Sequence, residues 1–127
     1  MTRLRLTPLS LIVALVCGGL GWVVRYLWIE PAEMGAACER ANLWWCPLRL
    51  SFIYFHQAYG MAWGALALAG LAVVLPRRAA PPAVIAAMVV AGLGLVLYNT
   101  AGAAVALVIA LVRAAWLDRA SAAPQRA

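Results

Sequence analysis

Two cysteines, Cys38 and Cys46, are the first residues of this chain whose types could support chemistry. They lie in a polar segment, 30–49, which separates two long apolar runs. On the oxidising side of a membrane such a pair favours a disulfide. Eight residues of straight helix would separate the two Cα atoms by ~12 Å, whereas a disulfide allows only ~4.4–6.8 Å. We therefore predict that the chain turns back between them and that the disulfide is structural, with a redox-active pair as the alternative.

The third cysteine, Cys17, lies within the first apolar run, and we expect it to be a free, small core residue. This run should be retained rather than cleaved as a signal peptide, because Val16 stands where a small residue is needed. Zinc is not expected, since two cysteines without a paired histidine cannot complete four ligands. No serine pairs with a histidine and no carboxylate falls inside an apolar run, so the sequence predicts neither catalytic residues nor a metal site.

His56 is the only histidine. Phe52, His56, Tyr59 and Trp63 recur at helical spacing and are expected to share one helix face, here termed the histidine stripe. An ionisable group inside a membrane is costly and is a functional candidate by default. His56 could contact a quinone head group or a lipid, ligate a haem or chlorophyll, or transfer a proton. Alternatively it is a neutral histidine that bonds to Tyr59, Gln57 or a backbone carbonyl.

Arg25 lies at a similar depth in the first run, and we expect it to extend outward and pair with Glu30, Glu33 or lipid phosphate. The chain has six Trp, four Tyr and two Phe. Most of them fall in the outer half of the predicted membrane spans, the half that contains Arg25 and His56, or in the segment 30–49. This bias predicts a packing surface or pocket around Arg25 and the histidine stripe. The alternative is a one-sided aromatic belt at the membrane interface.

Long apolar segments must position these groups, because hydrophobic residues make up 67% of the chain and charged residues only 11%. Crossing a bilayer core takes roughly 20 helical residues. Two runs fit one crossing each, and the third, 83–112, is barely long enough for two. We predict an all-α fold, a single-domain integral membrane four-helix bundle, with a tail at 120–127 that frays. The predicted helices are 9–29, 50–75, 83–98 and 101–117.

The ten basic residues, all arginine, indicate the orientation. A turn near 98–100 would place seven of them on one side of the membrane, and positive charge stays cytoplasmic. We therefore expect a multi-pass protein of a bacterial-type inner membrane with both termini in the cytoplasm. Three helices, with the C-terminus outside, is the alternative. The net charge of +6 is then a topology signal, so no nucleic-acid partner is expected.

The polar segment 30–49 is the outer loop of this arrangement. Pro31 suits a helix start and Glu33 suits its positive end, which predicts a short interfacial helix at 32–41. Trp44 and Trp45 would anchor the loop at the interface. Small residues predict close helix packing, and at least one such face is expected to meet a partner chain. These helix-packing candidates are Gly60, Gly64, Gly102, Ala106 and Ala110.

The sequence favours a small non-enzymatic accessory or assembly subunit of a larger inner-membrane complex, with electron transport as one setting. Membrane lipids and other membrane subunits are the expected partners. No cofactor is predicted, although a quinone or lipid could bind. The first alternative is a small quinone-linked thiol-disulfide oxidoreductase that uses Cys38, Cys46 and His56. A further alternative is a small transporter or channel, which the scarcity of polar residues along the runs disfavours.

Overall fold

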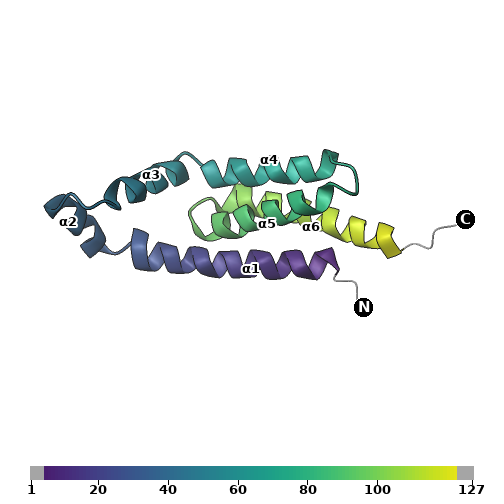
Figure 1. The fold of residues 1–127 in the computed structure, drawn as a ribbon, viewed down its shortest axis with the longest axis horizontal. Helices are drawn as coiled ribbons and strands as arrows, with labels where there is room; N and C mark the ends of the chain where they lie inside the picture. Colours follow the sequence, from purple (N-terminus) through teal and green to yellow (C-terminus); the bar gives the residue numbers. More distant parts are fainter. Residues whose placement is uncertain (1–4, 123–127) are drawn as a thin grey trace, which may run out of the picture.

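The computed structural model describes residues 5–122, which form helices joined by turns and contain no strand. One π-helical segment, η1, continues α1 (Figure 1). The elements in chain order are α1 Leu6–Val24, η1 Arg25–Ile29, α2 Ala32–Arg40, α3 Cys46–Gln57, α4 Gly60–Val74, α5 Ala80–Val96 and α6 Thr100–Ala122.

Helix α5 has the most extensive contacts in the bundle, because it packs against α1, α4 and α6. Figure 1 shows α2 and α3 extending past the turn that joins α5 to α6. We term this end, formed by α2, α3 and that turn, the distal end. At the opposite end, the frayed tail was predicted to start at residue 120, but α6 remains helical to Ala122. Residues 123–127 of that predicted tail lie outside the described range.

The core is made of small side chains, which let the helices approach closely. A Cβ on Gly92 would lie 2.5 Å from the carbonyl oxygen of Ala14, so glycine is what allows α5 to touch the backbone of α1. A Cβ on Gly102 would lie 2.6 Å from the Cβ of Ala62, which requires glycine between α6 and α4 in the same way. Alanines of α4, α5 and α6 fill the remaining interface, among them Ala65, Ala69, Ala87, Ala91, Ala106 and Ala110.

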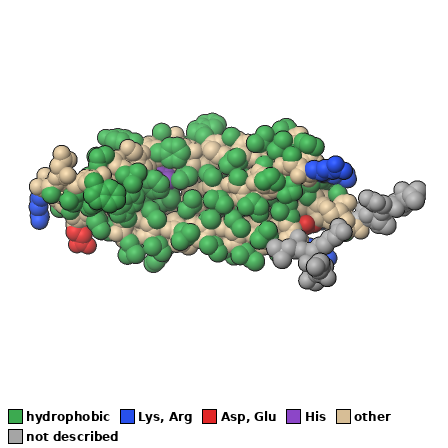
Figure 2. All heavy atoms as spheres, in the orientation of Figure 1, with side chains coloured by type: hydrophobic (Ala, Val, Ile, Leu, Met, Phe, Trp, Pro, Cys, Tyr) green, Lys and Arg blue, Asp and Glu red, His purple; other side chains and the backbone are tan. Residues whose placement is uncertain are grey.

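Two helices are long and apolar enough to cross a membrane: Leu6–Ile29, which joins α1 and η1, and α6. The bent pair α3 and α4 would make a third span, and α5 is a shorter apolar helix. Figure 2 shows hydrophobic side chains along the length of one face, with charged side chains only toward its two ends. This distribution is the one that a bilayer core requires of a protein surface.

The predicted single helix over 50–75 is wrong, because the helix starts earlier, at Cys46, and is interrupted between Gln57 and Gly60. Helix α3 starts at Cys46, with Pro47 in its first turn, where a missing N–H has no cost. Tyr59 then adopts a left-handed backbone conformation with φ of 58°, which ends α3, and α4 leaves at a bend of 63°. A left-handed residue cannot continue a right-handed helix, so the two halves lose their common register.

At the end of the bundle opposite the distal end, side chains of α6 form hydrogen bonds to backbone groups at the ends of α1 and α4. The Asp118 carboxylate on α6 accepts hydrogen bonds from the backbone N–H groups of Leu6 and Thr7, at 2.8 and 2.9 Å. This contact caps the N-terminus of α1, where an anion is favoured. Arg113 donates to the carbonyl oxygens of Ala72 and Leu75 at 3.0 and 2.8 Å, which caps the C-terminus of α4.

Candidate functional site

The break between α3 and α4 is held by Asn99, a buried residue in the α5–α6 turn. Its side-chain oxygen accepts a hydrogen bond from the N–H of Ala62 at 3.1 Å. Its amide nitrogen donates to the carbonyl oxygens of His56 and Leu97 at 3.1 and 3.0 Å. One amide therefore bonds to both the start of α4 and the end of α3, and it supplies the partner of the Ala62 N–H.

His56 lies in the last turn of α3, and only 4% of its surface is exposed. Its ring meets the ring of Phe52 edge-on, with 4.3 Å between centroids. Neither ring nitrogen has a hydrogen-bond partner among the described residues. The expected bond to Tyr59, Gln57 or a carbonyl is therefore not formed. Buried polar atoms without partners are uncommon in native proteins, so this ring needs an explanation.

A cavity of about 470 Å³ lies beside this ring. It is formed where the end of η1, the last turns of α3 and the α5–α6 turn meet. Its volume falls in the range of small-molecule sites, which is about 300–1,000 Å³. The lining side chains are those of Ile29, Ile53, His56, Gln57, Tyr59 and Tyr98.

The histidine stripe predicted from helical spacing does not exist as one face. Phe52 and His56 stay together on α3, but the break at Tyr59 turns the following residues elsewhere. Tyr59 is 61% exposed and Trp63 is 69% exposed, whereas His56 is buried. Tyr59 still lines the cavity from its exposed side, and Trp63 does not line it.

Arg25 pairs with Glu30, one of its expected partners, at 2.7 Å between Nε and Oε1. It also donates to the carbonyl oxygen of Val96 at 2.9 Å, at the C-terminus of α5. Its guanidinium lies over the Tyr98 ring, 4.1 Å from the centroid. The Tyr98 hydroxyl donates to the same Glu30 oxygen. Arg25 therefore influences the cavity through Tyr98, whose ring it holds in the wall.

The Glu30 carboxylate is stabilised in its charged form by these contacts. The hydrogen bond from Tyr98 is the largest cause of its lowered pKa, followed by the hydrogen bond from Arg25. Both bonds favour the ionised carboxylate, and burial opposes them. The ionised Glu30 carboxylate thus connects Arg25 of η1 to Tyr98 of the α5–α6 turn.

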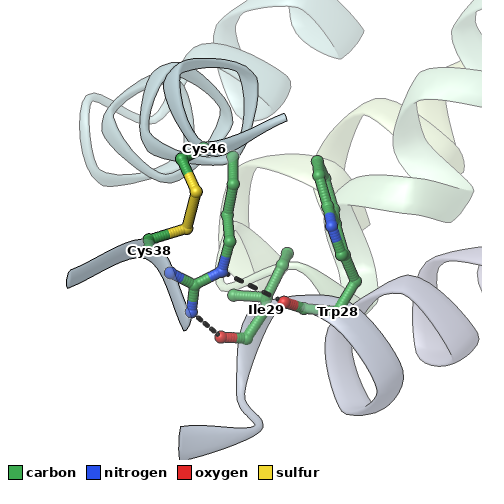
Figure 3. Close-up of a disulfide and its surroundings, with 5 residues drawn as sticks. Trp28, Ile29, Cys38 and Cys46 are labelled. Carbon is green, nitrogen blue, oxygen red and sulfur yellow. Dashed lines mark hydrogen bonds between the residues drawn. A yellow bond between two sulfur atoms is a disulfide. The ribbon is translucent and has the colours of Figure 1, made fainter. Parts of the chain in front are cut away.

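The predicted disulfide between Cys38 and Cys46 is confirmed, with 5.7 Å between the Cα atoms, and Cys17 is free. It connects the end of α2 to the start of α3 (Figure 3). Beside it, Arg49 donates to the carbonyl oxygens of Trp28 and Ile29 at 3.1 and 2.7 Å, drawn as dashed lines in Figure 3. The disulfide and Arg49 together fix α3 against α2 and the end of η1.

The disulfide and the histidine are separate features. Cys46 begins α3 and His56 follows ten residues later, which is ~15 Å along a helix at 1.5 Å per residue. The structure therefore does not assemble Cys38, Cys46 and His56 into one reactive site. The described residues also contain no group of three or more His, Cys, Asp or Glu side chains that could hold a metal ion.

The small residues proposed for helix packing are used inside the chain. Ala106 and Ala110 are completely buried in the bundle core, and Gly102 packs on α4. Gly64 faces Val90 of α5 at ordinary contact distance. Gly60 lies directly under the Phe55 ring, which a Cβ would overlap. The face of α6 that carries Gly102, Ala106 and Ala110 is therefore occupied by α4 and α5.

Two residues of this site were not identified from the sequence as functional: Asn99 and Arg49. An amide in a long apolar run was a usable signal for Asn99, since it must find partners there. For Arg49 the sequence shows only a charge beside an apolar run and gives no signal of its partners. Comparison with protein-family models, curated proteins and solved structures found no significant match to this chain, so the site is interpreted from its geometry.

Proposed function

We propose that the protein is a multi-pass protein of a bacterial-type inner membrane with four spans and cytoplasmic termini. In this arrangement α3 and α4 form one broken span, and α5, with 17 residues or ~25 Å, is a short one. A small local thinning of the bilayer would accommodate α5. The distal end then faces the outer, oxidising side, which agrees with the disulfide there.

Within that membrane we propose a non-enzymatic role, as a small accessory or assembly subunit of a larger complex, with electron transport as the setting to test first. One feature supports this role above others: the distal end is held by several contacts and carries large exposed aromatic side chains. The disulfide, Arg49 and Asn99 hold α3 in place. That helix and the preceding turn then expose large aromatic side chains, including Trp44 at 85% and Tyr54 at 65%.

Exposed aromatic side chains on a rigid support are typical of surfaces that bind other proteins. We therefore propose that the partner is another membrane subunit that packs on Trp44 and Tyr54. The thiol oxidoreductase remains a weaker candidate, because the disulfide lies far along α3 from His56. A transporter or channel lacks a supporting observation, since small apolar residues fill the interior of the described bundle.

Purification in a gentle detergent, followed by an absorption spectrum and mass spectrometry of co-purifying chains, tests this proposal. We expect a colourless sample with stoichiometric membrane subunits. The Trp44→Ala/Tyr54→Ala double variant should lose those subunits while remaining folded. Val74→Ala/Val112→Ala is the matched control, because it also removes two exposed apolar side chains, but from α4 and α6. A native sample without any partner would refute the accessory role.

A further inference from the structure

The two unpaired nitrogens of His56 are the one feature of the distal end that neither packing nor partner binding explains. A neutral imidazole carries one N–H donor and one nitrogen acceptor. Both are buried and both lack partners among the described residues. Leaving buried polar groups unpaired costs roughly 1–3 kcal/mol each, and a leucine at this position would avoid that cost. The ring is thus suited to a partner from outside the chain.

The walls of the adjoining cavity restrict what that partner can be. None of the lining residues is an acid or an arginine, so the cavity offers no counter-charge to an ionic group. Isoleucine side chains and the rings of Tyr59 and Tyr98 favour a flat, largely apolar group. The carboxylate of Glu30 and the guanidinium of Arg25 are already paired with each other. A neutral, planar head group with hydrogen-bonding oxygens fits these walls.

The position of the cavity adds a second restriction. It lies at the distal end of an apolar bundle, between the end of η1 and α3, where a span is broken. Gln57 and Tyr59, two of its lining residues, are exposed side chains. One of the lining side chains must move for a ligand to reach the buried ring nitrogens of His56. A ligand that arrives from the lipid phase can thus enter with its head group and leave an apolar tail outside.

We propose that this cavity binds the head group of a membrane quinone or quinol. The imidazole N–H would donate to a quinone carbonyl oxygen, and the other ring nitrogen would accept from a quinol hydroxyl. His56 is the binding residue, and Tyr98, held by Arg25 and Glu30, is a wall. The proposal concerns binding alone, and it does not depend on the partner subunit, because the cavity is complete within this chain.

The single histidine makes a direct test available. Protein labelled with ¹⁵N only in histidine gives one pair of ring signals in detergent micelles. Decylubiquinone should shift both signals in a saturable manner, because a ring nitrogen gains a hydrogen bond. A diacylglycerol supplies ester carbonyls on an apolar tail and should not. Equal shifts with both would assign the site to lipid esters and overturn the quinone proposal, and no shift with either would overturn it as well.

Affinity measurements on variants separate hydrogen bonding from shape. Quenching of tryptophan fluorescence by decylubiquinone should show about tenfold weaker binding in His56→Phe, which corresponds to one lost hydrogen bond. His56→Gln keeps a donor and an acceptor and should bind closer to the native protein. Val74→Ala, which changes an exposed side chain at the far end of α4 and away from the cavity, should bind normally. Native affinity in a folded His56→Phe variant would refute the proposal. If that variant does not fold, unshifted ¹⁵N ring signals in the native protein would refute it instead.

Discussion

Replacing Asn99 with alanine should destabilise the protein more than any other change to a single polar side chain in the α5–α6 turn. The residue is 2% exposed, and its side chain makes three hydrogen bonds. In the variant the N–H of Ala62 has no partner in the first turn of α4. The carbonyl of His56 loses less, because it also accepts the N–H of Tyr59 at 3.0 Å.

The expected size of the effect follows from these three bonds. An orphaned buried N–H costs roughly 1–3 kcal/mol, and the two bonds to carbonyls add about 0.6 kcal/mol each, the average found within membrane proteins. We therefore expect Asn99→Ala to lower the free energy of unfolding by about 2–4 kcal/mol. Asn99→Asp should be at least as damaging at neutral pH, since it keeps the acceptor for Ala62 but turns an anionic oxygen toward two carbonyls.

Reversible unfolding in mixed micelles, followed by circular dichroism, measures this difference. Thr100→Ala is the matched control, because the neighbouring hydroxyl donates one exposed hydrogen bond, to the Leu95 carbonyl at 3.1 Å. That change should cost less than about 1 kcal/mol. If Asn99→Ala lost no more stability than the control, or if Asn99→Asp were as stable as the native protein, the assigned role of Asn99 in the helix break would be wrong.

Three further predictions concern orientation, the disulfide and pH. Reporter fusions at the two chain ends should both show a cytoplasmic location, and a periplasmic C-terminus would support three spans instead. The Cys38→Ser/Cys46→Ser variant should lose about 2–3 kcal/mol of stability, and mass mapping without reductant should find the cross-link; folding without loss of stability would contradict a structural role. Because contacts with Tyr98 and Arg25 lower the folded-state pKa of Glu30, its contribution to stability should be complete above the ordinary carboxyl pKa and disappear as pH falls through the lowered value. The free energy of unfolding, measured against pH, should therefore be higher for the native protein than for Glu30→Gln at neutral pH, and this difference should disappear in acid. A difference that stays constant with pH would refute this linkage.

The helical nature of the chain and the disulfide could be predicted from the sequence because both depend on local or pairwise information. Apolar run length indicates helices that can span a membrane, and two cysteines in one loop have few alternatives to each other. The break at Tyr59 could not be predicted in this way. Its sequence signal is only one residue in a left-handed conformation, and the groups that stabilise it come from Asn99, forty residues away in sequence.

The same limit explains the mixed result for the site residues. Helical spacing placed Phe52 beside His56 correctly, because both lie within α3. It placed Tyr59 and Trp63 on the same face incorrectly, because periodicity assumes that the helix continues. The unpaired state of His56 was also beyond sequence reasoning. It depends on the surrounding helices excluding every donor and acceptor from the ring.

The arginines illustrate how one composition can serve two physical roles. Every basic residue in the chain is arginine, although lysine would give the same charge asymmetry. Arg49 and Arg113 each use Nε and Nη2 to reach two carbonyl oxygens at the end of another helix. A planar guanidinium presents those two donors in a fixed geometry, whereas an ammonium group is a point charge on a flexible stem. The last carbonyl groups of a helix have no partner within it, and at the end of an apolar span a rigid two-donor side chain can pair with two of them at once. The preference for arginine at these two positions therefore follows from the helix ends, whereas the proposed orientation in the membrane depends only on the charge of the arginines as a set.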